Sequence, residues 1–155
     1  MRRQVNLCSR ILSAWLAVLA AINVSAANTA DTEGVNTVIA AYYDGMTRGD
    51  PGVLADVLHN QWHLKTLTGP EEPRLLVGTK REYIEMYTDV QQPDYADDRH
   101  ITSIDFAYNS LAIVRIDSPT RRHSVFFTLV KTKGIWKITS KAFIAEEEAL
   151  LYSQP

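Results

Sequence analysis

The sequence predicts an α+β domain in which a strongly curved, mostly antiparallel sheet packs against three helices from the N-terminal half of the chain. Three observations carry this prediction. Apolar residues recur at helical spacing in three segments before residue 91, two apolar strands follow them, and a long hairpin closes the chain. The sequence shows no internal repeat and no linker, so residues 27–155 are expected to form a single domain.

The terminal hairpin, residues 122–143, organises the rest of the prediction. Lys133-Gly134 separates two β-branched and aromatic runs and suits a two-residue turn, because glycine readily adopts a positive φ. Counting back from that turn fixes which residues share a face. One apolar face is expected to pair Lys131 with Trp136, Leu129 with Ile138, Phe127 with Ser140, Val125 with Ala142 and His123 with Ile144. The other is expected to carry Ser124, Phe126, Thr128, Val130, Lys137, Thr139, Lys141 and Phe143.

Residues 1–26 have the pattern of a signal peptide. Arg2 and Arg3 precede an apolar stretch, Ile11–Val24, and Val24-Ser25-Ala26 forms a small-residue cleavage box. An uncleaved membrane anchor is the alternative, but about 14 apolar residues fall short of the roughly 20 that span a bilayer. We therefore expect export to the periplasm or the extracellular space, with no membrane association after cleavage.

Composition narrows the function classes of the mature domain. Cys8, the only cysteine, lies in the leader, so neither a disulfide nor thiol chemistry is expected in residues 27–155. Removing the leader's three arginines leaves 13 basic and 18 acidic side chains, a formal charge of −5. A domain of this charge has no basic patch for nucleic acid.

Start and stop signals bound the three helices. The first runs from Val35 to about Arg48, where Gly49 ends it. Asp50 caps a short second helix with Pro51 at its first position. The third opens with a capping box at Thr79-Lys80-Arg81-Glu82. The first helix is expected to bury Val35, Val38, Ile39, Tyr42 and Met46.

Four segments outside the terminal hairpin complete the predicted elements. A first strand covers about residues 62–67, with Trp62, Leu64 and Thr66 on one face and His63, Lys65 and Leu67 on the other. Two prolines and a glycine break it before a short return strand at 75–77. Strands at 101–107 and 111–116 are joined across Tyr108-Asn109-Ser110, where asparagine suits a tight turn.

Three stretches carry a family resemblance. They are Tyr42 to Asp50, continued by Leu54, Leu58 and His59; Gly78 to Ile84; and Gly134 to Phe143. Residues 33–145 resemble the lumazine-binding branch of the nuclear transport factor 2-like superfamily, whose SnoaL-like fold is a cone-shaped barrel. The resemblance implies that fold, a pocket inside the cone and a homodimer formed through the outer sheet surface. It does not imply a particular activity, because this fold serves isomerases, dehydratases, cyclases and noncatalytic modules.

In the ketosteroid isomerases of this superfamily, a tyrosine of the first helix donates to the substrate. Tyr42 lies at the matching distance before Gly49-Asp50. The matching end of the first strand, His63-Leu64-Lys65-Thr66, lacks the carboxylate base of those enzymes. The resemblance therefore does not carry the isomerase mechanism to this chain.

The candidate ligand-pocket residues are Tyr42, His63, Asp105, His123, Phe127 and Trp136. A tight turn at Asn109-Ser110 would place Asp105 opposite Val114 on the inward face, where it could share protons with His123. The alternative register turns Ile104 and Phe106 inward and exposes Asp105. His59 and His63 are spaced for a metal only if both lie on one helix; one at a helix end and one in a strand leave no metal site.

The leading functional prediction is an exported domain that binds a small apolar or aromatic molecule in its pocket, without a cofactor. Two alternatives stay open. One is a cofactor-independent lyase or isomerase that uses Tyr42, His63, Asp105 or His123 as acid and base. The other is a noncatalytic, dimerising interaction module. No glycine-rich phosphate loop, nucleophile elbow or paired-carboxylate motif favours the enzyme.

Overall fold

The computed structural model describes residues 29–68, 74–90, 98–120 and 122–145. The chain divides into two compact units, residues 1–33 and 34–155, and the description below concerns the second. The predicted signal peptide lies outside the described residues. Within those residues, no helix is long and apolar enough to cross a membrane.

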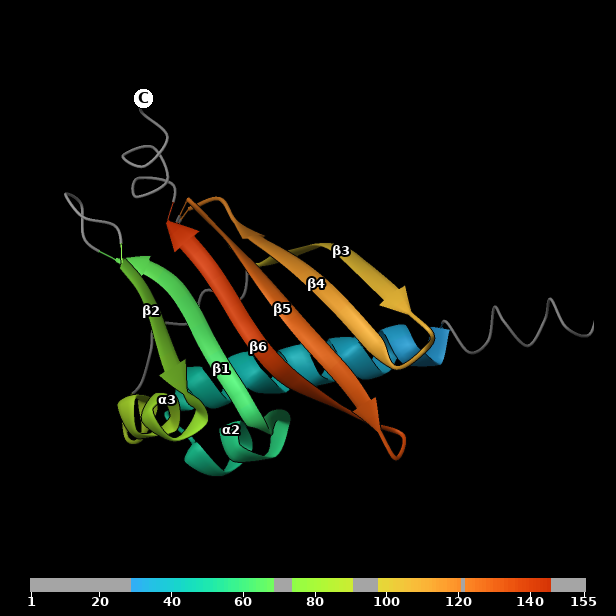
Figure 1. Ribbon diagram of the computed structural model, residues 1–155, viewed down its shortest axis with the longest axis horizontal. Coiled ribbons are helices and arrows are strands. Elements are labelled where there is room, and N and C mark those ends of the chain that lie inside the picture. The colour runs from blue at the N-terminus through green and yellow to red at the C-terminus, as the bar shows by residue number, and fades with distance from the viewer. Residues whose placement is uncertain (1–28, 69–73, 91–97, 121, 146–155) are drawn as a thin grey trace, which may run out of the picture. The chain divides into compact units, whose positions relative to one another are not determined.

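Six strands form one mixed sheet (Figure 1). They are β1 (Leu58–Thr68), β2 (Arg74–Thr79), β3 (His100–Ala107), β4 (Leu111–Ser118), β5 (His123–Thr132) and β6 (Ile135–Ala145). Their order is β2-β1-β6-β5-β4-β3; β1 and β6 run parallel, and the other neighbours run antiparallel. The predicted α+β class with a mostly antiparallel sheet is confirmed, but β2 and β3 are free edges and the sheet is not a closed barrel.

Three helices lie in the described residues. The first covers residues 29–48, and α2 (Pro51–Val57) and α3 (Lys80–Tyr87) are short. Gly49, at a φ of 64°, ends the first helix: Gly49 N–H donates to Met46 at 3.3 Å and Asp50 N–H to Gly45 at 2.9 Å. These two bonds make a Schellman end, which favours glycine at the left-handed position.

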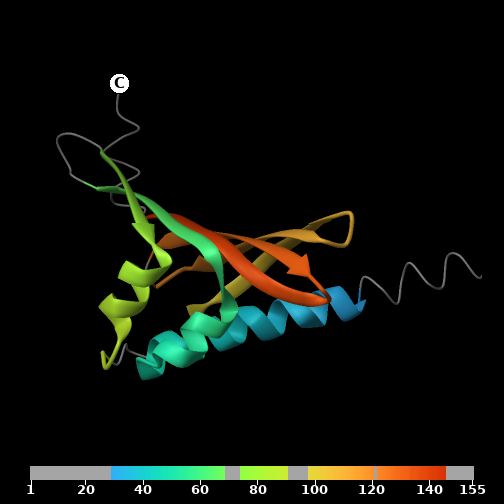
Figure 2. The same ribbon diagram turned by 60° about the horizontal axis from the view of Figure 1, so that its bottom comes forward.

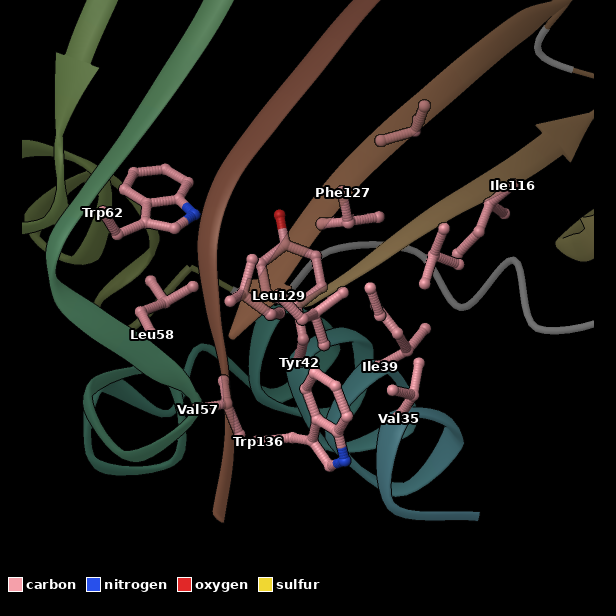
Figure 3. Close-up of a cluster of buried hydrophobic side chains, with 14 of the residues drawn as sticks. Val35, Ile39, Tyr42, Val57, Leu58, Trp62, Ile116, Phe127, Leu129 and Trp136 are labelled. Atoms are coloured by element: carbon pink, nitrogen blue, oxygen red, sulfur yellow. The ribbon is translucent and has the colours of Figure 1, made fainter. Parts of the chain in front are cut away.

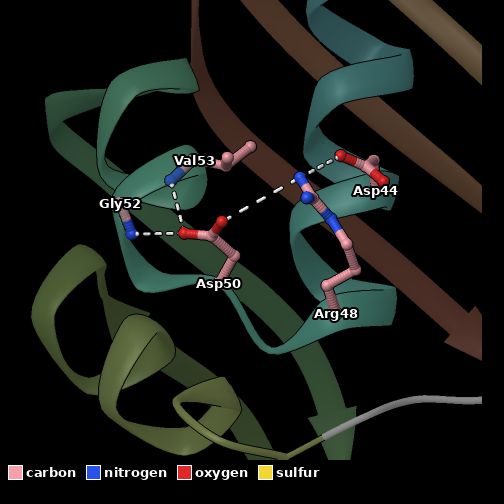
Figure 4. Close-up of polar contacts among 5 residues, drawn as sticks. All are labelled: Asp44, Arg48, Asp50, Gly52 and Val53. Carbon is pink, nitrogen blue, oxygen red and sulfur yellow. Dashed lines mark hydrogen bonds and ion pairs between the residues drawn. The ribbon is translucent and has the colours of Figure 1, made fainter.

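Local side chains start the two short helices as predicted. The Asp50 carboxylate accepts from the N–H groups of Gly52 at 3.0 Å and Val53 at 3.1 Å (Figure 4). At α3, Thr79 and Glu82 form both bonds of the capping box. These bonds satisfy N–H groups that a helix start otherwise leaves open.

The core lies between the first helix and one face of the sheet (Figures 2 and 3). Tyr42 of the helix and Phe127 of β5 are completely buried, and their rings meet edge to face at a centroid distance of 5.2 Å. Trp62 from β1 and Trp136 from β6 extend the core at either side of them. We call the helix-covered face the inner face and the opposite face the outer face.

The register of the terminal hairpin follows the prediction near its turn and departs from it beyond Leu129. Leu129 pairs with Ile138 as expected, but a bulge follows, so Thr128 pairs with Ser140 and Phe127 with Lys141. The extra residue, Thr139, donates its hydroxyl to the carbonyl of Thr128 at 3.0 Å, which anchors the bulge. The expected pairs beyond this point are wrong by one residue.

This shift exchanges the faces of the second half of β6. Lys141 and Phe143 were expected on the outer face, but Lys141 is 8% exposed and Phe143 packs against the core. Ala142 pairs with Phe126 on the outer face. A lysine therefore enters the inner face.

Asp105 lies on the outer face and is exposed, so the register that would turn it inward is not the observed one. The loop after β3 holds three residues, with Tyr108 and Asn109 both at positive φ, so Ala107 pairs with Leu111 and Asp105 with Ile113. The alternative register is therefore the observed one, because Ile104 and Phe106 pack against the core. The Asp105–His123 pair does not form.

Candidate ligand cleft

A cleft of about 390 Å³ lies where the first helix passes β3 and β4. Its apolar lining comes from Ile39, Ile101 and Ile116. Both strand residues belong to the inner face, where Ile101 pairs with Ile116. The remaining lining is Asn36, Ala40, Tyr43, Asp44, Thr47 and Arg99.

Polar and aromatic groups meet at the rim of the cleft. The guanidinium of Arg99 lies 4.1 Å from the centroid of the Tyr43 ring, a distance typical of a cation–π contact. Asp44 is an exposed carboxylate that Arg48 contacts at 2.5 Å, one helical turn further on (Figure 4). The rim thus offers an aromatic face, a positive charge and a carboxylate within one helix–strand junction.

None of the six predicted pocket residues lines this cleft. Tyr42 lies behind it, with its ring 5.1 Å from that of Tyr43, and Phe127 lies deeper, 6.1 Å from Tyr43. Trp136 is buried against the start of the helix, because a Cβ at Gly34 would lie 2.8 Å from its ring. Tyr42 and Phe127 therefore contact the lining residue Tyr43 from the side of the core.

The two histidines lie elsewhere. His123 keeps its predicted inner-face position at the start of β5, where it pairs with Ser118 and its ring lies 6.2 Å from that of Phe143. His63 is half-buried and alternates with the buried Trp62 and Leu64, so it belongs to the outer face. Among the described residues, no group of three His, Cys, Asp or Glu side chains is placed to hold a metal ion.

Behind the cleft, Tyr42 and Tyr83 share a buried hydroxyl contact. The Tyr42 and Tyr83 hydroxyls are hydrogen-bonded to each other, and the Tyr83 hydroxyl also lies 3.1 Å from Met46 Sδ. Burial raises the pKa of both tyrosines well above the ordinary value. Both hydroxyls therefore stay protonated at neutral pH.

Sequence reasoning missed Tyr43, Asp44 and Arg99 as cleft residues. Tyr43 directly follows the inward Tyr42, and a helical residue one step from the core stripe lies at its border. That position was the available signal for Tyr43. Arg99 precedes β3, and the chain gives no local pattern that would place it over a helix 56 residues earlier.

Solved structures place this architecture in a known class. A nuclear transport factor 2-like protein of unknown function from Silicibacter pomeroyi is 22% identical, with a TM-score of 0.59 over 72% of this chain and 92% of that one. A second from Shewanella baltica is also 22% identical, with a TM-score of 0.60 over 72% and 90%. A putative scytalone dehydratase from Novosphingobium aromaticivorans is 16% identical, with a TM-score of 0.53 over 77% and 86%. At these identities the likeness shows the fold, which is nuclear transport factor 2-like.

The sequence match is more specific. The family described as "putative lumazine-binding" matches residues 30–144, and the chain belongs to this family. A search of the curated proteins finds no match. The predicted family resemblance is thereby confirmed.

Proposed function

We propose that the domain binds a small, planar heteroaromatic molecule in the cleft between the first helix and the β3–β4 pair. The observation that carries the proposal is the cleft itself, whose volume of about 390 Å³ falls in the range of ligand pockets, roughly 300 to 1,000 Å³. Ile39, Ile101 and Ile116 supply an apolar contact surface. Tyr43 and Arg99 supply a stacking platform with a positive charge.

The rim suits a ring that carries both hydrogen-bond donors and acceptors. Asp44 accepts, Arg99 donates, and the Asn36 amide does both. Pteridinediones such as lumazine have this combination of a flat ring, imide N–H groups and carbonyl oxygens. The family description names this class, and lumazine is therefore the first probe.

Filling the cleft tests the proposal. Ala40 is an exposed helix residue in the lining, and Ala40→Phe places a ring in the cleft without touching the buried core. We expect lumazine affinity, measured by fluorescence titration, to fall by about tenfold or more, equivalent to about 1.4 kcal/mol.

Thr37→Phe is the matched control, because Thr37 is exposed on the same helix but does not line the cleft. This variant should bind like the parent. If the parent does not bind lumazine or related pteridines, the proposed ligand class is wrong. If Ala40→Phe binds as well as Thr37→Phe, the cleft is not the site.

We also propose that two copies of the domain associate through the outer face of the sheet. A second hollow of about 280 Å³ opens on this face. Its lining comes from the outer-face residues Lys65, Leu67, Leu75, Ser124, Phe126 and Ala142, and it also reaches Thr66 and Phe143. Phe126 is 45% exposed, and the exposed residues Leu75, Val77 and Ile113 lie on the same face of the sheet. Contiguous apolar surface of this kind is typical of protein interfaces.

Sedimentation velocity at micromolar concentration tests the dimer. We expect the parent to sediment as a dimer and Phe126→Asp to sediment as a monomer, because the change puts a charge at the centre of the apolar surface. Tyr108→Asp is the control, since Tyr108 is 99% exposed at the β3–β4 turn and should leave assembly unchanged. A parent protein that is strictly monomeric would contradict the proposal.

A further inference from the structure

Asp98 directly precedes Arg99 of the cleft, and both of its carboxylate oxygens accept hydrogen bonds. Oδ2 accepts from the hydroxyl of Ser118, and Oδ1 accepts from the backbone N–H of Thr120 at 2.7 Å. Ser118 is only 3% exposed, so water has little access to compete for that bond. Hydrogen bonds to an ionised acceptor are stronger than those between neutral groups. Asp98 therefore ties the residues before β3 to the end of β4.

The backbone to which Asp98 is tied is itself held by other contacts. Ser118 is the last residue of β4 and pairs with His123 of β5. Just beyond it, the N–H of Arg122 donates to the carbonyl of Pro119 at 3.1 Å and closes the turn between the two strands. The carboxylate thus has a fixed anchor.

Arg99 lies between this anchor and the first pair of the β3 ladder. On its other side, His100 pairs with Asp117. Strand ends fray unless contacts beyond the last pair hold them. With its backbone held on both sides, Arg99 extends over the Tyr43 ring, 4.1 Å from guanidinium carbon to ring centroid.

The anchor and the cleft share one face of the sheet. Ser118 follows the cleft residue Ile116 by two positions, and both side chains are buried on the inner face. Asp98 itself does not line the cleft. It can therefore affect a ligand there only through the neighbours that it holds in place.

We propose that Asp98 is a positioning residue for the cleft, because it holds the segment that presents the Arg99 guanidinium over Tyr43. This inference rests on the function proposed above, in which Arg99 donates to a bound heteroaromatic ring. A donor that is already oriented loses less conformational freedom when the ligand binds. Asp98 thereby raises the affinity without contacting the ligand.

A double-mutant cycle with lumazine as the probe tests whether Asp98 acts through Arg99. We expect Asp98→Ala to lower the affinity, measured by fluorescence titration, about three- to tenfold, and Arg99→Met to lower it about tenfold. The double variant should bind like Arg99→Met alone. Losses that multiply to about thirty- to hundredfold would mean that Asp98 acts independently of Arg99, and would overturn the proposal.

Two further variants separate positioning from a loss of stability. In Asp98→Asn the amide can still accept from Thr120 and donate to the Ser118 hydroxyl, so its affinity should stay within about twofold of the parent. Asp117→Ala is the matched control, because Asp117 also accepts from a serine hydroxyl, that of Ser124 at 2.6 Å, but on the outer face. It should bind lumazine like the parent. Asp98→Asn binding as weakly as Asp98→Ala contradicts the proposal, and Ser118→Ala replaces Asp98→Ala in the cycle if the latter does not fold.

The Arg99 side chain gives a second readout that needs no ligand. Because it lies over the Tyr43 ring, the ring current should shift its proton NMR signals upfield in the parent. We expect this shift to be lost in Asp98→Ala and kept in Asp98→Asn and Asp117→Ala. If the parent does not bind lumazine, the proposed ligand class is wrong, while this measurement still tests the role of Asp98. An unchanged shift in Asp98→Ala overturns that role.

Discussion

Replacing Trp136 by alanine is expected to lower the free energy of unfolding by about 3 to 5 kcal/mol. The indole is 4% exposed and is enclosed by three neighbours: the Gly34 backbone, the Phe106 ring at 5.9 Å and the Lys131 ammonium at 5.7 Å. Removing it leaves a cavity between the first helix and β6. Because a domain of this size has a total stability of about 5 to 15 kcal/mol, the loss would unfold a marginal domain.

The neighbouring residue provides the control for this experiment. Ile135 precedes Trp136 in β6 but is 60% exposed, so Ile135→Ala should move the unfolding free energy by less than about 1 kcal/mol. Urea unfolding curves of the two variants measure the difference. Similar midpoints for Trp136→Ala and the parent would show that this indole does not support the core.

Gly49→Ala is expected to destabilise the domain by about 2 to 4 kcal/mol. The residue combines a φ of 64° with close approach of another backbone: an added Cβ would lie 2.8 Å from Val90 N and 3.0 Å from Tyr87 O. The Gly49 carbonyl also accepts from Asp89 N–H at 3.2 Å. The end of the first helix is thereby fixed against the turn after α3, and a methyl group would force the two apart.

Gly134 separates the cost of the positive φ from the cost of the close backbone approach. It has a comparable φ of 80°, but a Cβ there would meet nothing within 4 Å. Gly134→Ala should therefore cost only the conformational strain, about 1 kcal/mol or slightly more. If thermal unfolding shows equal losses for the two variants, close packing at Gly49 contributes nothing.

The elements that local chemistry specifies could be predicted from the sequence. Gly49, Asp50 and the Thr79–Glu82 box bound helices through contacts within a few residues, and all three hold in the structure. Lys133-Gly134 likewise fixed the hairpin register up to Leu129. Such signals are readable because the atoms that make them are close in sequence.

The rest depended on contacts that no local pattern encodes. At β6, alternation favours Lys141 on the exposed face, whereas the bulge turns it into the core. There its ammonium lies near the rings of Tyr42, Tyr83 and Phe143. At the β3–β4 turn, the choice between two and three loop residues reversed the faces of Asp105 and its neighbours. The cleft could not be predicted from the sequence for the same reason, because Arg99 and Tyr43 are far apart in the chain and meet only in the folded structure.

The position of β6 in the sheet also bears on how the chain folds. This strand is the last in sequence, yet it lies between β1 and β5 and joins the β2-β1 hairpin to the β5-β4-β3 meander. Until its residues are present, each of those two parts exposes an unsatisfied edge that could pair with other chains. The parallel ladder from Leu58 to Thr66 also requires closure of a loop that contains most of the domain. Long-range closure of this kind slows folding, so we expect the pairing of β6 with β1 to be a slow step.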